Sequence, residues 1–327
     1  MGHVLHSSRT DATGVLPLLL FSFSAAIGLV DCIWAQEAGF AVTGRAYGEL
    51  ALAAGLFFGA GYIYARWRPE PRLAAMLTGT GFLIGFTAAA SVLNAMLVTV
   101  AGHRIDAVLA RADLALGLHW LQMMQAVAGH PGLLWVLQFA YGLLLPEIAL
   151  AVIVLGTLGR IASLYRFVLA VAIGALISIF IWTLVPSFGA MSVYALDLTT
   201  IAKLHVVTDG AYGQALVRML HDGPGLIAPD EIKGMIGFPS YHAVLALLLV
   251  WHFRYVRWLR WPVLALNVIV IAATPIEGGH HWLDVFAAIP VAVLAIVAAR
   301  RTYALAARLG DSWGLSDSRA ERASSAI

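Results

Sequence analysis

Apolar stretches long enough to cross a lipid bilayer recur along the whole chain. A transmembrane helix needs about 20 mostly apolar residues. The sequence predicts eight such helices, at residues 15–36, 48–65, 74–101, 132–158, 165–185, 238–253, 258–276 and 282–299. Hydrophobic residues make up 61% of the chain and charged residues 12%, whereas roughly a quarter of the residues of a soluble domain are charged. We therefore expect an all-α integral membrane protein.

The charge balance narrows the classes of partner. The chain has 20 Lys and Arg residues against 18 Asp and Glu residues, a net charge of +2. It therefore lacks the basic character of a nucleic-acid-binding domain, and we expect the lipid bilayer, not nucleic acid, as its partner. The single cysteine, Cys32, excludes an intramolecular disulfide.

The distribution of Lys and Arg also predicts the orientation of the helices. Positively charged loops tend to stay on the cytoplasmic side of a membrane. With eight spans and the N-terminus inside, most of the 20 Lys and Arg residues fall on that side. Both termini are therefore predicted to be cytoplasmic.

Two segments between the spans are expected to lie outside the membrane core. Residues 103–130 mix apolar and polar positions at near-helical spacing, which favours an interfacial helix on the outer surface. Residues 186–237 form a long polar loop on the same side, and loops of this length are commonly functional or disordered.

Three ionisable side chains are predicted at one membrane depth, where the outer loop re-enters the bilayer. His242 lies about one turn inside the outer end of the 238–253 helix. His280 and Asp284 are four residues apart and hence on one helical face, so Asp284 can hold one imidazole nitrogen. A lone histidine at a helix end usually makes an ordinary hydrogen bond, but ionisable residues inside spans tend to mark function. A histidine paired with a carboxylate has the arrangement that an activated nucleophile or base needs.

These residues belong to two motifs that carry a family resemblance. Phe238-Pro239-Ser240-Tyr241-His242 and His280-x-x-x-Asp284, separated by one helical hairpin, resemble the second and third motifs of the type 2 phosphatidic acid phosphatase superfamily. The motifs are similar in particular to those of the branch that contains inositol phosphorylceramide synthases and their bacterial relatives.

The resemblance implies a domain organisation and a location. A six-helix phosphatase or phosphotransferase core would occupy residues 74–302 and include the interfacial helix 103–130 and the outer loop 186–237. Residues 1–73 would add two N-terminal transmembrane helices, and residues 303–327 would form a cytoplasmic tail. A bacterial inner (plasma) membrane, with the active site on the periplasmic side, is the implied location.

The resemblance also implies the chemistry. His280 would attack a lipid phosphate and become a phosphohistidine, and Asp284 would orient it. His242 would protonate the departing oxygen and then activate the acceptor. Neither a metal nor a cofactor is implied. The candidate substrate-binding residues are Ser240, Tyr241, Lys203, Arg218, Lys233 and Glu277.

Two departures from the family pattern concern the positive charge around the phosphate. The Ser-Arg pair expected before the nucleophile falls on Ala273-Thr274, and the family's first motif, Lys-x6-Arg-Pro, has no match. The equivalent place after the 165–185 helix reads Val185-Pro186-Ser187-Phe188-Gly189-Ala190, which keeps a proline and supplies no charge.

The residues leave several functions open. The acceptor could be water, as in a phosphatase, or a lipid hydroxyl, as in a head-group transferase of the inositol phosphorylceramide synthase type. A transporter could use the same His and Asp residues as a proton or substrate site. A zinc site built from His242, His280 and Asp284 is a further alternative, because the ligand types suit zinc.

Overall fold

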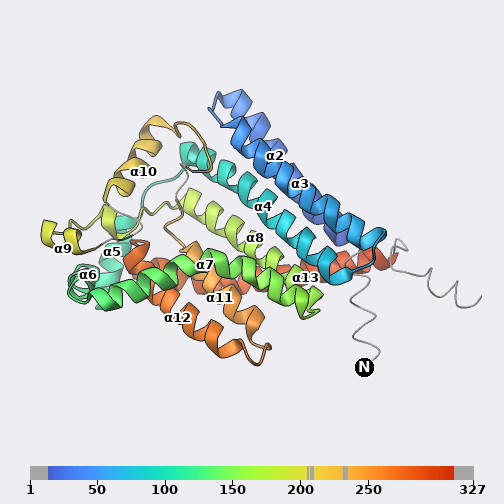
Figure 1. Ribbon diagram of the computed structural model, residues 1–327. Coiled ribbons are helices and arrows are strands. Elements are labelled where there is room, and N and C mark those ends of the chain that lie inside the picture. The colour runs from blue at the N-terminus through green and yellow to red at the C-terminus, as the bar shows by residue number, and fades with distance from the viewer. Residues whose placement is uncertain (1–13, 205, 207–209, 231–234, 313–327) are drawn as a thin grey trace, which may run out of the picture.

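The computed structural model describes residues 14–204, 206, 210–230 and 235–312, and within them the chain is helical (Figure 1). The β pairing among the described residues is a single isolated bridge between Val42 and Ile227. The α-helices are α2 (Val15–Ala38), α3 (Gly44–Arg66), α4 (Pro71–Leu97), α5 (Asp106–Ala115), α6 (Trp120–Ala128), α7 (Pro131–Thr157), α8 (Ile161–Leu184), α9 (Leu198–Lys203), α10 (Gly210–Asp222), α11 (Tyr241–Phe253), α12 (Arg260–Glu277) and α13 (Trp282–Ser312). Two short 3-10 helices are also present: η1 (Val98–Val100) follows α4, and η2 (Ala190–Ser192) follows α8.

The helix lengths confirm an all-α membrane architecture. Seven of the described helices, α2, α3, α4, α7, α8, α12 and α13, are long and apolar enough to cross a bilayer. The sixth predicted span, 238–253, is instead the shorter apolar helix α11, with 13 residues. At 1.5 Å per residue it covers about 20 Å of a hydrocarbon core of about 30 Å. The turn that precedes α11 therefore lies where a longer helix would have continued.

The predicted interfacial helix 103–130 is two helices, α5 and α6. Gly117 adopts a positive φ of 76° just after α5, a conformation that only glycine adopts readily. The chain therefore turns there, although the polar and apolar pattern continues on both sides. Figure 1 shows α5 and α6 at the same end of the bundle as α9 and α10.

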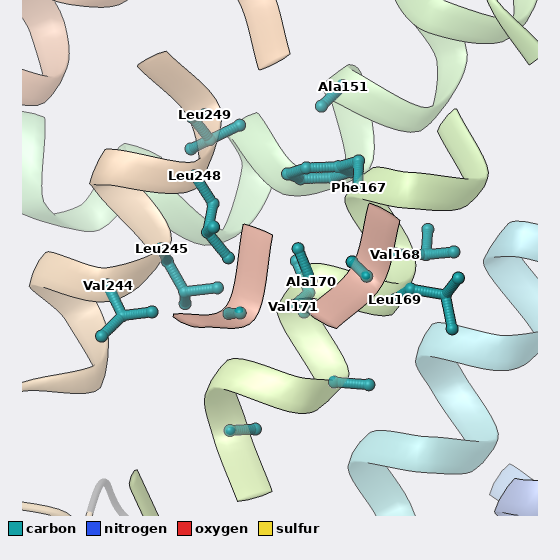
Figure 2. Close-up of a cluster of buried hydrophobic side chains, with 14 of the residues drawn as sticks. Ala151, Phe167, Val168, Leu169, Ala170, Val171, Val244, Leu245, Leu248 and Leu249 are labelled. Atoms are coloured by element: carbon teal, nitrogen blue, oxygen red, sulfur yellow. The ribbon is translucent and has the colours of Figure 1, made fainter. Parts of the chain in front are cut away.

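The centre of the bundle is α8. Its side chains Leu164, Tyr165, Phe167 and Val168 are fully buried. Figure 2 shows Phe167, Val168 and Leu169 of α8 in one apolar cluster with Val244, Leu245 and Leu248 of α11. This packing holds α11, and the polar turn before it, against the middle of the molecule.

At one edge of the bundle, α2 and α3 lie along α4 (Figure 1). Only 22% of the apolar window of α2 and 11% of that of α3 are buried, against 67% for α8. These two helices therefore form a peripheral layer whose outer faces are available to lipid.

Asp106, at the start of α5, fixes the loop that follows α8. Its Oδ1 accepts hydrogen bonds from the Ser187 hydroxyl at 3.0 Å and the Phe188 amide at 2.7 Å. Its Oδ2 pairs with Arg104 Nη2 at 2.8 Å. Burial alone would raise the pKa of Asp106, but His281, Arg104 and the Phe188 amide together hold this pKa below its ordinary value. The carboxylate is therefore charged when it binds the loop.

Asp113, two turns further along α5, caps α13. It is buried, and its two carboxylate oxygens accept hydrogen bonds from the amides of Trp282 at 2.9 Å and Leu283 at 3.1 Å. The first amides of a helix have no partner within the helix, and a negative charge at that end is stabilising. A residue some 170 positions away in sequence thus supplies the cap that α13 lacks locally.

We predict that Asp113→Ala destabilises the protein by about 1–3 kcal/mol, because two amides at the start of α13 lose a buried acceptor. Thermal unfolding of the purified protein in detergent checks this. Asp222→Ala, which removes an exposed carboxylate from α10, should unfold like the wild type. Equal unfolding temperatures for the Asp113 variant and the wild type would show that the cap contributes nothing.

Candidate active site

His280 and Asp284 lie at the junction of α12 and α13 and contact each other as the sequence predicts. His280 precedes Trp282, the first residue of α13, so the pair does not share a helical face as expected. Asp284 Oδ2 accepts a hydrogen bond from His280 Nδ1 at 3.2 Å and another from the His281 amide at 2.9 Å. Asp284 is fully buried and His280 is 5% exposed. The carboxylate therefore fixes both the orientation of the ring and the nitrogen that carries the proton, which leaves His280 Nε2 directed away from Asp284.

Ser240 lies on the other side of the His280 ring. Its Oγ is 3.3 Å from His280 Nε2, and it also accepts a hydrogen bond from the Ala243 amide as the N-cap of α11. The Ser240 amide in turn donates to the backbone carbonyl of Asp284 at 2.9 Å. These contacts hold the N-terminus of α11 beside Nε2, and a helix N-terminus is a natural binding site for an anion.

His242, the second residue of α11, is the third predicted residue of the site. Its ring stacks on Tyr141 of α7, with ring centroids 4.6 Å apart and an interplanar angle of 12°. It is close enough to His280 for the two rings to interact electrostatically. The structure thus brings His242, Ser240, His280 and Asp284 together from two helix N-termini.

The floor of the site is made of closely packed backbone. The amide of Ala190 donates to the carbonyl of Gly279 at 2.6 Å. Gly189 has φ +80°, and a Cβ on it would lie 2.3 Å from the Gly279 carbonyl oxygen. A Cβ on Gly237 would lie 2.1 Å from the Ser187 carbonyl oxygen. The loops before α11, after α8 and before α13 can meet this closely only because these positions are glycine.

His281, the neighbour of His280, faces the opposite way and was missed by sequence reasoning. It is fully buried between the two aspartates of α5, with Nε2 3.7 Å from Asp106 Oδ1 and Nδ1 3.7 Å from Asp113 Oδ2. The only sequence signal was the pair of adjacent histidines, because nothing in the spacing relates residue 281 to residues 106 and 113. The contacts place His281 behind the site, as part of its support.

The other predicted binding residues are placed less centrally. The Tyr241 hydroxyl donates to the Val171 carbonyl of α8 at 2.9 Å, and Glu277 is fully buried at the end of α12. Lys203, at the end of α9, and Arg218, on α10, are both exposed. Lys233 lies outside the described residues.

Arg104 is a cation that sequence reasoning did not select. Its Nη2 donates to Ser192 Oγ at 2.8 Å, and its guanidinium lies 4.5 Å from the centroid of the Phe188 ring. It therefore contacts the loop where the missing first motif of the family was expected. Ala273 and Thr274, where the family's Ser-Arg pair was expected, are fully buried, and the Thr274 hydroxyl donates to the Val270 carbonyl.

Within the described part of the chain, no group of three or more His, Cys, Asp and Glu residues could hold a metal ion. The zinc site considered from the sequence, with His242, His280 and Asp284 as ligands, is therefore not formed by this arrangement. Asp284 is instead hydrogen-bonded to His280 Nδ1 and to the His281 amide.

Comparison with known proteins identifies the family. A model of the PAP2 superfamily matches residues 107–298, from the first turn of α5 to the C-terminal half of α13. Neither the curated proteins nor the solved structures include a match. The matched region contains the two motifs, the loop after α8 and all four side chains that meet at the site. More than half of the chain is covered, so this protein belongs to the PAP2 superfamily.

Proposed function

We propose that the protein is a metal-independent phosphatase or phosphotransferase of membrane lipid phosphates that works through a phosphohistidine on His280. Membership of the PAP2 superfamily, whose proteins are generally phosphatases or phosphotransferases, supports action on a phosphoric ester. One observation carries the mechanism. His280 Nδ1 is hydrogen-bonded to Asp284, while Nε2 lies 3.3 Å from Ser240 Oγ at the N-terminus of α11.

In the first step, the lone pair of His280 Nε2 attacks phosphorus and a P–N bond forms. The P–O bond to the leaving group breaks, and the departing oxygen takes a proton from His242. Asp284 stabilises the positive charge that develops on the His280 ring through its hydrogen bond to Nδ1. The transferred phosphoryl group lies against the free amides at the start of α11.

In the second step, His242 takes a proton from the acceptor, whose oxygen attacks phosphorus as the P–N bond breaks. Water as acceptor yields phosphate, whereas a lipid hydroxyl yields a new phosphoester. The same three side chains serve both reactions. The more specific proposal is that the protein transfers a head group to a lipid hydroxyl. Lys203, Arg218 and Lys233 are proposed to supply positive charge around the phosphate, and Arg104 joins them because it contacts the loop after α8.

The proposal includes a membrane orientation. The site lies at the start of α13, which Asp113 of α5 caps, and α5 lies at the end of the bundle that also carries α6, α9 and α10 (Figure 1). The distribution of Lys and Arg supports an extracytoplasmic position for this end, with both termini in the cytoplasm of a bacterium and the helices in its inner membrane.

The first test is turnover without metal. We expect the purified protein to release phosphate from one or more lipid phosphates of a panel in the presence of EDTA. His280→Ala should reduce the rate at least about 10³-fold, because the nucleophile is lost. His130→Ala, which removes an exposed histidine at the start of α7, is the matched control and should retain activity. Activity that survives His280→Ala would exclude the phosphohistidine mechanism.

The second test separates the roles of the two histidines. A p-nitrophenolate leaving group needs no protonation, whereas an alkoxide does. We therefore expect His242→Ala to slow formation of the phosphoenzyme strongly with an alkyl ester and only weakly with a p-nitrophenyl lipid ester. Rapid-quench measurement of acid-labile phosphohistidine follows this step directly. An equal loss with both esters would contradict the role of His242 as the general acid.

The third test asks whether all substrates pass through one phosphoenzyme. If all substrates pass through one phosphoenzyme, the ratio of phosphate to alkyl phosphate formed in the presence of a primary alcohol is the same for every leaving group. Product analysis by mass spectrometry gives this ratio. A ratio that varies with the leaving group would indicate direct attack of the acceptor on the substrate.

A further inference from the structure

A cavity of about 730 Å³ lies between α2, α3 and α4, outside the residues that match the PAP2 superfamily. A volume of this size is in the range of sites for small ligands. Its walls are mostly apolar and include Phe21, Phe58, Ala88 and Val92. The residues of the candidate active site do not line it. The cavity is therefore a separate feature of the peripheral layer.

Glycines create much of this space. Gly28 of α2, together with Gly48 and Gly55 of α3, lines the cavity, and a Cβ at any of the three would meet no atom within 4 Å. Larger side chains at these positions would fill the cavity without a clash at Cβ. Because α2 and α3 each pack along α4, the volume is the space beside α4 that these glycines leave unfilled.

Asp31 is the unusual member of the lining. It is 4% exposed, and neither of its carboxylate oxygens has a hydrogen-bond partner among the residues that the structure describes. Of the polar side chains that line the cavity with it, Tyr47 is hydrogen-bonded to Ser91 at 3.2 Å, whereas the Ser24 hydroxyl is buried and also has no partner among the described residues. A buried carboxylate without donors is costly, above all in a membrane. Among the described residues no donor contacts the Asp31 carboxylate, so a ligand in the cavity can supply one.

We propose that this cavity binds an amphiphile with a protonated amine head group and an alkyl chain. The ammonium group offers three N–H donors and a positive charge to the two free oxygens of Asp31. The apolar walls accept the hydrocarbon chain. An alcohol would offer a single donor and no charge, and a carboxylate or phosphate head group would be repelled by Asp31. This assignment does not depend on the proposed phosphotransfer chemistry.

Cys32 provides a direct test because it lines the same cavity, is exposed, and is the single cysteine of the chain. The full-length protein, in bilayer discs of phosphatidylcholine, is treated with N-ethylmaleimide and the alkylation of Cys32 is followed by mass spectrometry. Phosphatidylcholine has no N–H on its head group and so does not mimic the proposed occupant. Dodecylamine, dodecanol and dodecanoate, which share one chain length, are the probes.

We expect dodecylamine to protect Cys32 and the other two probes to have little effect at the same concentration. If the occupant blocks the thiol, labelling slows by the factor 1 + [L]/Kd, which is about elevenfold at ten times Kd. Equal protection by all three probes, or protection by none, would overturn the proposal.

Two pairs of variants locate the effect. Asp31→Asn should abolish the preference for dodecylamine, whereas Glu49→Gln, on the exposed pair with Arg45, should retain it. Gly28→Leu should abolish protection by filling the cavity. Gly59→Leu is its control, because Gly59 lies on α3 with open space around it and does not line the cavity. A preference that survives Asp31→Asn, or protection that survives Gly28→Leu, would show that the amine binds elsewhere.

Discussion

The two aspartates of α5 are the interaction on which the candidate site depends. Asp106 accepts the Ser187 hydroxyl and the Phe188 amide, and Asp113 accepts the first amides of α13. In the interior of a membrane protein, backbone groups that lack a helical partner must find one within the protein. The loop after α8 and the start of α13 are two such places, and one short helix outside the spans satisfies both. α5 thus fixes both segments, and the hydrogen bond from the Ala190 amide to the Gly279 carbonyl links them directly.

This arrangement gives the two adjacent histidines opposite environments. His281 lies between Asp106 and Asp113, whereas His280 lies between Asp284 and Ser240. Because consecutive side chains at the start of a helix point in different directions, fixing His281 on one side also fixes the direction of His280 on the other. The short length of α11 also helps to position the site. It begins within the bundle, so its N-terminus meets the His280 ring at the depth where α13 also begins.

The protein also combines two polar sites of opposite preference within an apolar scaffold. The start of α11 presents backbone amides and suits an anion, whereas the cavity beside α2 presents the unpartnered carboxylate of Asp31 and suits a cation. The first lies within the PAP2-matched region and the second in the peripheral layer outside it. The proposed phosphate chemistry thus lies within the matched region, and the proposed amine site lies outside it.

Local hydrophobicity predicted the membrane class and most of the helix positions. The four-residue spacing of His280 and Asp284 predicted their contact, although His280 lies just before α13 and not on its face. The sequence also indicated that the Phe238–His242 motif faces this pair, through the resemblance to a family. The tertiary structure alone decided that 103–130 is two helices, that Asp106 and Asp113 support the site, and that Arg104 contacts the loop after α8. It alone revealed the cavity at Asp31. These features join residues that are far apart in the chain, and their contacts arise from helix packing, which no local pattern of residues encodes.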